Sequence, residues 1–67
     1  MPVAKVIEIV GISNKGWQEA VENTVKETAK SVRHIRRVYV KQLIGEVEGD
    51  KIVEYRAAVK IAFDVER

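Results

Sequence analysis

The pair Gly49-Asp50 divides the second half of the chain into two long runs of strand-forming residues. A Gly-Asp pair between such runs is typical of a two-residue β-hairpin turn, in which glycine supplies a positive φ. When Glu48 is placed opposite Lys51, apolar residues of the two runs lie opposite one another. They are Val53, Tyr55, Ala57, Val59, Ile61, Phe63 and Val65 on one side, and Val38, Val40 and Ile44 on the other. The sequence therefore predicts a long antiparallel hairpin with one apolar face.

Two further elements precede this hairpin. The segment from Val3 to Ile12 is rich in β-branched residues and predicts a first strand. Apolar residues then recur at helical spacing from about residue 15 to Arg33, which predicts an amphipathic helix roughly 28 Å long. The members of this apolar stripe are Trp17, Ala20, Val21, Val25, Thr28, Ala29 and Val32.

This order of elements predicts an α+β fold, a single β-α-β-β unit that forms one domain over residues 1–67. We expect a three-stranded antiparallel-type sheet wrapped on one helix, with the last strand in the middle. Hairpin strands of about fourteen residues span roughly 45 Å, which is longer than the helix. Apolar side chains at Ile44, Val47, Ile52 and Val53 are then left uncovered, which indicates assembly into a homo-oligomer. A shorter hairpin with a frayed tip is the alternative.

Two adjacent arginines, Arg36 and Arg37, stand at the start of the hairpin. Because consecutive strand residues point to opposite faces, we expect their guanidiniums to serve different surfaces. Arg37 then lies opposite Ala62 on the face away from the helix, and Arg36 lies at the edge of the covered face. Arg56 is expected opposite Leu43, also on the uncovered face and roughly 20 Å from Arg37. Arg37 and Arg56 can grip one small ligand together only if a second subunit brings its own copy across a symmetry axis.

Four stretches of the chain resemble the dodecin family. They are KVIEIVGIS, the helix start NKGWQEAV, RHIRRVYVKQ and VEYRAAVKIAF, and together with the element order they cover nearly the whole chain. The resemblance implies a hollow spherical dodecamer of β-α-β-β protomers. It also implies storage or sequestration of flavins, whose isoalloxazine rings stack in pairs between aromatic side chains near two-fold axes. Some members of the family lack flavin, and calcium has been described in that branch.

This chain departs from the family pattern at the flavin site itself. The resemblance places Arg37 where the family has its stacking tryptophan, and Arg56 where it has a glutamine that hydrogen-bonds the flavin. A guanidinium pairs with phosphate or carboxylate in a bidentate manner, but it does not replace the π-sandwich of an indole. We therefore expect the pocket to prefer an anion, such as FMN or another phosphorylated ligand, over neutral riboflavin. The candidate ligand-binding residues are Arg37, Arg56, Tyr39, Gln42 and Glu46.

Three functions remain open from the sequence. The first is a dodecin-like cage that binds or stores a flavin or another small anion. The second is a ligand-free structural assembly in which Arg37 and Arg56 form intersubunit salt bridges with acids such as Glu46 or Glu54. The third, a nucleic-acid binder, is disfavoured because acidic residues are interspersed throughout and the net charge is only +2.

The other chemically informative residues favour ordinary structural roles. No nucleophile, base and acid occur at a catalytic spacing and no phosphate-binding glycine motif is present, so we expect no enzymatic activity. Glu46, Glu48 and Asp50 offer too few oxygens for calcium without symmetry mates, and no metal site is expected. Trp17 is expected to pack in the core or between subunits. The chain has no cysteine and no apolar run of membrane-spanning length, which is compatible with a cytoplasmic protein.

Overall fold

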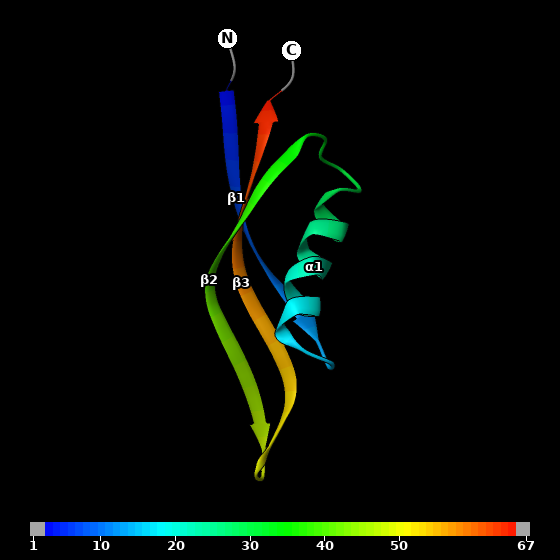
Figure 1. Cartoon of the computed structure of the whole chain (residues 1–67), viewed down its shortest axis with the longest axis vertical. Coiled ribbons are helices and arrows are strands. Elements are labelled where there is room, and N and C mark those ends of the chain that lie inside the picture. Colours follow the sequence, from blue (N-terminus) through cyan, green and yellow to red (C-terminus); the bar gives the residue numbers. More distant parts are fainter. Residues whose placement is uncertain (1–2, 66–67) are drawn as a thin grey trace.

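The computed structural model describes residues 3–65, which form three strands and one helix. Strand β1 covers Val3–Ser13, helix α1 covers Trp17–Thr28, strand β2 covers Ile35–Glu48 and strand β3 covers Lys51–Val65. The strands form one sheet in the order β1-β3-β2, and both neighbouring pairs are antiparallel. Helix α1 lies against one face of the sheet (Figure 1). The predicted β-α-β-β order and the central position of the last strand are thus confirmed.

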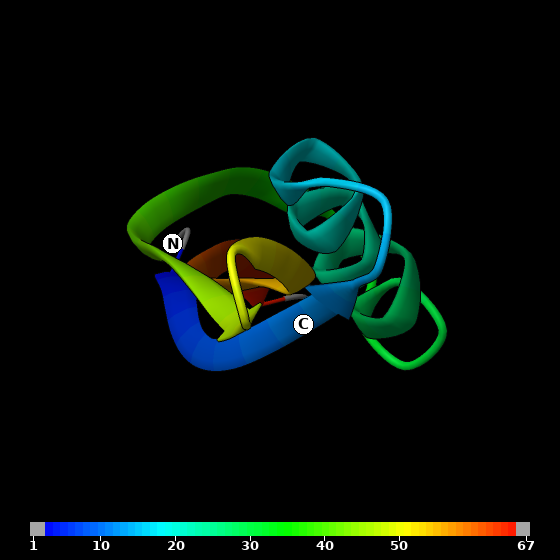
Figure 2. The ribbon, with the colours of Figure 1, turned by 90° about the horizontal axis from the view of Figure 1, so that it is seen from below.

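The hydrophobic core lies between α1 and the middle strand. Ala20 of the helix and Ala57, Val59 and Ile61 of β3 are buried almost completely. Around them pack Ile7, Ile9, Val21, Val25, Ile35 and Val38. Of the alternating apolar residues predicted for the last strand, Ala57, Val59 and Ile61 are therefore the ones buried under the helix. Viewed along the long axis of the molecule, the sheet curves strongly and carries α1 on one side (Figure 2).

Helix α1 is shorter than predicted. Its 12 residues span about 18 Å, whereas the molecule is 52 Å long. The predicted extension to Arg33 is wrong because the chain turns directly after Thr28. Short-range hydrogen bonds from the N–H groups of Lys30 and Ser31 to the carbonyls three residues earlier close this turn. His34 then takes a φ of 60° and leads the chain into β2.

The start of α1 is organised by Ser13 at the end of β1. Its Oγ accepts hydrogen bonds from the backbone N–H groups of Lys15 and Gly16, at 2.9 and 3.3 Å. The same hydroxyl donates to Oε1 of Glu19 in the first helical turn, at 2.6 Å. This arrangement joins the strand, the loop and the acidic first turn, where a carboxylate is favourable.

The hairpin turn has the predicted geometry. Gly49 has a φ of 66°, and Glu48 lies opposite Lys51. With 14 residues in β2 and 15 in β3, the hairpin is long and extends well beyond the helix (Figure 1). Near its tip, the side chains of Val47, Ile52 and Val53 are 65%, 43% and 44% exposed. The predicted uncovered apolar residues are therefore present at these three positions, and the alternative of a shortened hairpin is not observed.

The register between β2 and β3 departs from the prediction in the middle of the hairpin. Arg37 lies opposite Ala62 as predicted, but the pairing shifts by one residue between Val40 and Gln42. Arg56 consequently lies opposite Ile44, and the predicted pairing of Arg56 with Leu43 is wrong. The cause is a β-bulge that leaves one residue of β2 without a partner.

This bulge also changes which side chains share a face. Because directly paired residues lie on the same side of a sheet, Ile44 is on the face of Arg56 and not on the helix-covered face. Ile44 therefore does not belong to the uncovered apolar group at the tip. No helix within residues 3–65 has the length and apolarity needed to cross a membrane.

Candidate functional site

One face of the sheet is left without cover by α1, and we call it the open face. It carries Ala4, Val6, Glu8, Val10 and Ile12 from β1, Arg37, Tyr39, Gln42, Ile44 and Glu46 from β2, and Glu54, Arg56, Ala58, Lys60 and Ala62 from β3. Four of its larger apolar residues, Val6, Val10, Ile12 and Tyr39, are 46–55% exposed. An apolar surface of this extent is typical of a contact with another molecule.

A hollow of about 530 Å³ lies at the end of the open face where β2 begins. It is lined by Ala4, Arg36, Arg37, Tyr39, Ala62, Phe63 and Asp64, and we call it the arginine hollow. Its volume falls within the range of about 300–1,000 Å³ that is usual for small-molecule sites. The short side chains of Ala4 and Ala62 leave space in the hollow. Arg36, Arg37 and Tyr39 supply hydrogen-bond donors.

The two adjacent arginines line the same hollow, which corrects the prediction that they serve different surfaces. Ile35 lies opposite Phe63 and Arg37 opposite Ala62, so Arg36 has no partner in the ladder and forms a bulge. A bulge breaks the strict alternation of side chains and redirects the extra residue. The Nε of Arg36 donates a hydrogen bond to Oδ2 of Asp64 at 2.7 Å. Arg37 forms no ion pair with any of the residues 3–65.

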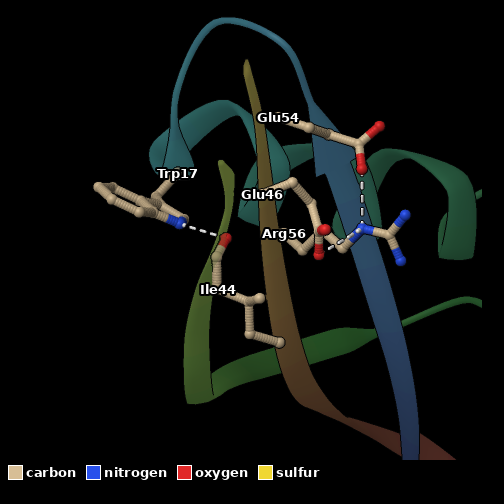
Figure 3. A network of polar contacts seen from close by, with 5 residues as sticks. All are labelled: Trp17, Ile44, Glu46, Glu54 and Arg56. Carbon is tan, nitrogen blue, oxygen red and sulfur yellow. Dashed lines mark hydrogen bonds and ion pairs between the residues drawn. The ribbon is translucent and has the colours of Figure 1, made fainter. Parts of the chain in front are cut away.

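Arg56 has a different environment at the other end of the open face. Its Nε donates a hydrogen bond to Oε1 of Glu54 at 2.8 Å and lies 3.9 Å from Oε2 of Glu46 (Figure 3). Glu46 and Glu54 are opposite one another on β2 and β3, so the guanidinium offsets the repulsion of a like-charged pair. The hydrogen bond with Glu54 is the main cause that raises the pKa of Arg56, and the charges of both carboxylates add to it.

A third charged group crosses the middle of the open face. Oε1 of Glu8 on β1 accepts a hydrogen bond from Nζ of Lys41 on β2 at 3.1 Å, and its Oε2 lies 4.0 Å from Nζ of Lys60 on β3. These contacts tie all three strands together. The hydrogen bond from Lys41 is the main cause that lowers the pKa of Glu8, and the charges of Lys41 and Lys60 add to it.

Trp17 packs inside the protomer on the helix side of the sheet. Its Nε1 donates a hydrogen bond to the carbonyl oxygen of Ile44 at 3.0 Å (Figure 3). Its ring meets that of Tyr55 edge-on, with 4.8 Å between centroids and an interplanar angle of 84°. The prediction of a packing role is confirmed, since these contacts fix the first turn of α1 to the hairpin.

The five residues predicted to bind ligand fall into two places within one protomer. Arg37 and Tyr39 line the arginine hollow, whereas Gln42, Glu46 and Arg56 lie further along the open face towards the hairpin tip. Arg36 and Asp64 also line the arginine hollow, and their place there could not be predicted from the sequence because a bulge leaves no periodic signal. Within the described range 3–65, no three His, Cys, Asp or Glu side chains are grouped so that they could hold a metal ion.

Comparisons with known proteins agree with this architecture. The dodecin family model matches residues 3–66. The dodecin of Thermus thermophilus is 28% identical over 64 residues, which cover 96% of this chain and 93% of that protein. The structure of a mutant of that dodecin superposes with a TM-score of 0.95 at 27% identity, and the similarity covers 100% of both chains.

Two other solved structures extend the comparison. The dodecin of Streptomyces coelicolor has a TM-score of 0.93 at 27% identity and covers 98% of this chain and 94% of its own. A calcium-chelating antigen of Mycobacterium tuberculosis, described as a calcium dodecin, has a TM-score of 0.83 at 30% identity, with 96% and 91% of the two chains covered. Since the family model spans nearly the whole sequence and the element order and sheet topology agree with it, the chain belongs to the dodecin family.

Proposed function

We propose that this protein is a small-ligand binding or storage protein without enzymatic activity, formed by one domain that assembles into a hollow homododecamer in the cytoplasm. The ligand is a small anion, with FMN or another phosphorylated flavin as the leading candidate. It occupies an intersubunit pocket to which Arg37 contributes in place of a stacking tryptophan. Neither nucleic acid nor a membrane is part of this proposal.

The observation that carries the proposal is the state of Arg37. Its side chain is exposed in a hollow on the open face, and it has no counter-ion within residues 3–65. A guanidinium in this position attracts phosphate or carboxylate and forms charge-assisted hydrogen bonds with them. A neutral flavin ring can stack on the guanidinium, but without a phosphate it forms none of these charge-assisted hydrogen bonds.

The apolar surface supports self-assembly as the source of the pocket. Exposed apolar side chains occur both on the open face and at the hairpin tip, where α1 does not reach. A 67-residue chain buries only roughly 60% of its unfolded surface when it folds alone. Copies of the same chain are the simplest cover for these surfaces, because symmetric association buries the same patch on every subunit.

A second function, a ligand-free structural assembly, is supported by the state of Arg56. The carboxylates of Glu54 and Glu46 already offset the positive charge of this guanidinium, so Arg56 attracts an anionic ligand only weakly. In this alternative, Arg56 stabilises the hairpin and Arg37 finds an acidic partner on a neighbouring subunit. Because the carboxylates of Glu46 and Glu54 already pair with Arg56, we do not propose them as calcium ligands.

Titration with FMN and with riboflavin separates the two functions. The purified protein is titrated with each flavin while flavin fluorescence is followed. We expect FMN to bind about tenfold or more tightly than riboflavin, and we expect Arg37→Gln to abolish this preference, because a hydrogen bond to a charged group contributes about 1.5–3 kcal/mol. Equal affinities for the two flavins would refute the preference for an anion. No binding of either flavin, together with loss of assembly in Arg37→Gln, would support the structural assembly.

A further inference from the structure

The arginine hollow has a composition that suits one particular chemical group. Its lining holds two guanidiniums, one phenol and a single carboxylate, that of Asp64, so the hollow carries a net charge of +1 at neutral pH. We propose that it binds a tetrahedral oxyanion, the phosphate of a phosphomonoester or inorganic phosphate, through Arg36 and Arg37 of the same protomer. For the ligand as a whole, this inference rests on the proposed function. It adds to that function the position of the phosphate subsite and the residues that form it.

The bulge at Arg36 is the feature that creates this subsite. In a regular strand, adjacent arginines would point to opposite faces and could not hold one phosphate. Here both line one hollow. Ile35 pairs with Phe63 and Arg37 with Ala62, and Arg36 forms the bulge between these two pairs. Two guanidiniums that line one hollow repel one another, so an oxyanion between them is favoured.

Asp64 positions Arg36 and also sets the strength of the site. The ion pair runs from Nε of Arg36 to Oδ2 of Asp64, and a guanidinium has five N–H donors in all. The Asp64 side chain is 39% exposed, so its carboxylate both orients Arg36 and repels an incoming anion. Removal of its charge should therefore strengthen phosphate binding.

The opposite end of the open face does not offer an equivalent site. There a single guanidinium, that of Arg56, faces the two carboxylates of Glu46 and Glu54, which leaves a net charge of −1. An oxyanion is repelled from such a group. Arg56 therefore lies outside the phosphate site, to which Arg36 and Arg37 contribute.

Calorimetric titration of the native protein with inorganic phosphate, at low ionic strength, tests the subsite without any flavin. We expect phosphate to bind the wild type, and Arg36→Gln and Arg37→Gln each to weaken it by about tenfold or more. Asp64→Asn should strengthen it several-fold. Arg56→Gln is the matched control and should leave it unchanged. Absence of phosphate binding, or an equal loss in Arg56→Gln and Arg37→Gln, would overturn the inference.

Two further measurements on the same samples separate this inference from the proposed function. Competition between phosphate and FMN, with no competition from riboflavin, would place the FMN phosphate in the arginine hollow. If phosphate binds but FMN gains nothing over riboflavin, the subsite is a site for inorganic phosphate, and the inference stands while the flavin proposal fails. Sedimentation of each variant shows whether a loss of affinity follows from a loss of assembly, and a variant that loses affinity only through disassembly would count against the subsite.

Discussion

Replacement of Gly11 by alanine should destabilise the protein strongly, because α1 packs on β1 at this glycine. A Cβ at Gly11 would overlap the carbonyl oxygen of Ala20, lie 2.5 Å from Cγ2 of Thr24 and lie 3.0 Å from the carbonyl carbon of Ala20. Two of these three atoms belong to the helix backbone, which cannot move away by a change of rotamer. The helix as a whole must shift.

The expected magnitude follows from the cost of overpacking. Extra atoms in a packed core cost about 1–3 kcal/mol. Because the contact is with backbone, we expect Gly11→Ala to lie at the upper end, about 3 kcal/mol. For a domain of this size, 1 kcal/mol corresponds to a shift of about 4–8 °C in melting temperature. The mutant should therefore melt about 12–24 °C below the wild type.

Gly45→Ala provides a matched control on β2. A Cβ at Gly45 would lie 3.4 Å from Cγ2 of Ile52 and 3.5 Å from Cζ2 of Trp17, which are ordinary van der Waals distances. The free energy of unfolding of Gly45→Ala should stay within about 1 kcal/mol of the wild-type value. Alanine lowers the conformational entropy of the unfolded chain, and its Cβ meets no clash in the folded chain. Thermal unfolding followed by circular dichroism measures both mutants. Similar melting temperatures for Gly11→Ala and Gly45→Ala would refute the reasoning.

Three further predictions concern single residues. Glu8→Gln removes a carboxylate whose pKa lies below its ordinary value of 4.5, mainly because Lys41 donates a hydrogen bond to it. Since the pKa of Glu8 is lower in the folded chain, its stabilisation is complete above about pH 4.5 and is lost as the pH falls through the folded-state pKa. The difference in melting temperature between Glu8→Gln and the wild type should therefore shrink in acid. A difference that does not depend on pH would contradict this. Trp17→Phe removes the hydrogen bond to the Ile44 carbonyl and should lower the free energy of unfolding, measured in urea, by about 1 kcal/mol. An unchanged free energy of unfolding would show that a water molecule replaces the indole N–H as the donor at no cost. Gly49→Ala places a Cβ at a φ of 66° and should cost about 1–2 kcal/mol in thermal unfolding, with Gly49→Asn less affected; equal losses would argue against strain at this position.

Much of the fold could be predicted because it depends on periodic signals. Gly49-Asp50 fixed the turn, and the alternation around Val59 identified the face of β3 that is buried under the helix. The existence of α1 followed from the spacing of its apolar residues. Its end did not, because residues after Thr28 keep helical spacing in the sequence while the chain forms hydrogen-bonded turns that lead into β2.

The candidate site was harder to predict because it depends on bulges. A bulge places one extra residue in one strand, and this residue need not be of any particular type. The alternation of apolar and polar residues therefore does not reveal where a bulge lies. One bulge brings Arg36 into the hollow of Arg37, and another places Ile44 opposite Arg56. Arg37 and Tyr39 could be assigned to the open face from parity alone, since no bulge lies between them. The pairing of Arg36 with Asp64 could not be assigned in this way.

The central claim is that exposed apolar surfaces on the open face and at the hairpin tip are covered by further copies of this chain. Light scattering of the purified protein at micromolar concentration, after size-exclusion chromatography, tests this claim most directly. The account predicts a single peak with a mass about twelve times that of the 7.6 kDa chain. A folded species that elutes at 7.6 kDa and remains monomeric as the concentration is raised would contradict it.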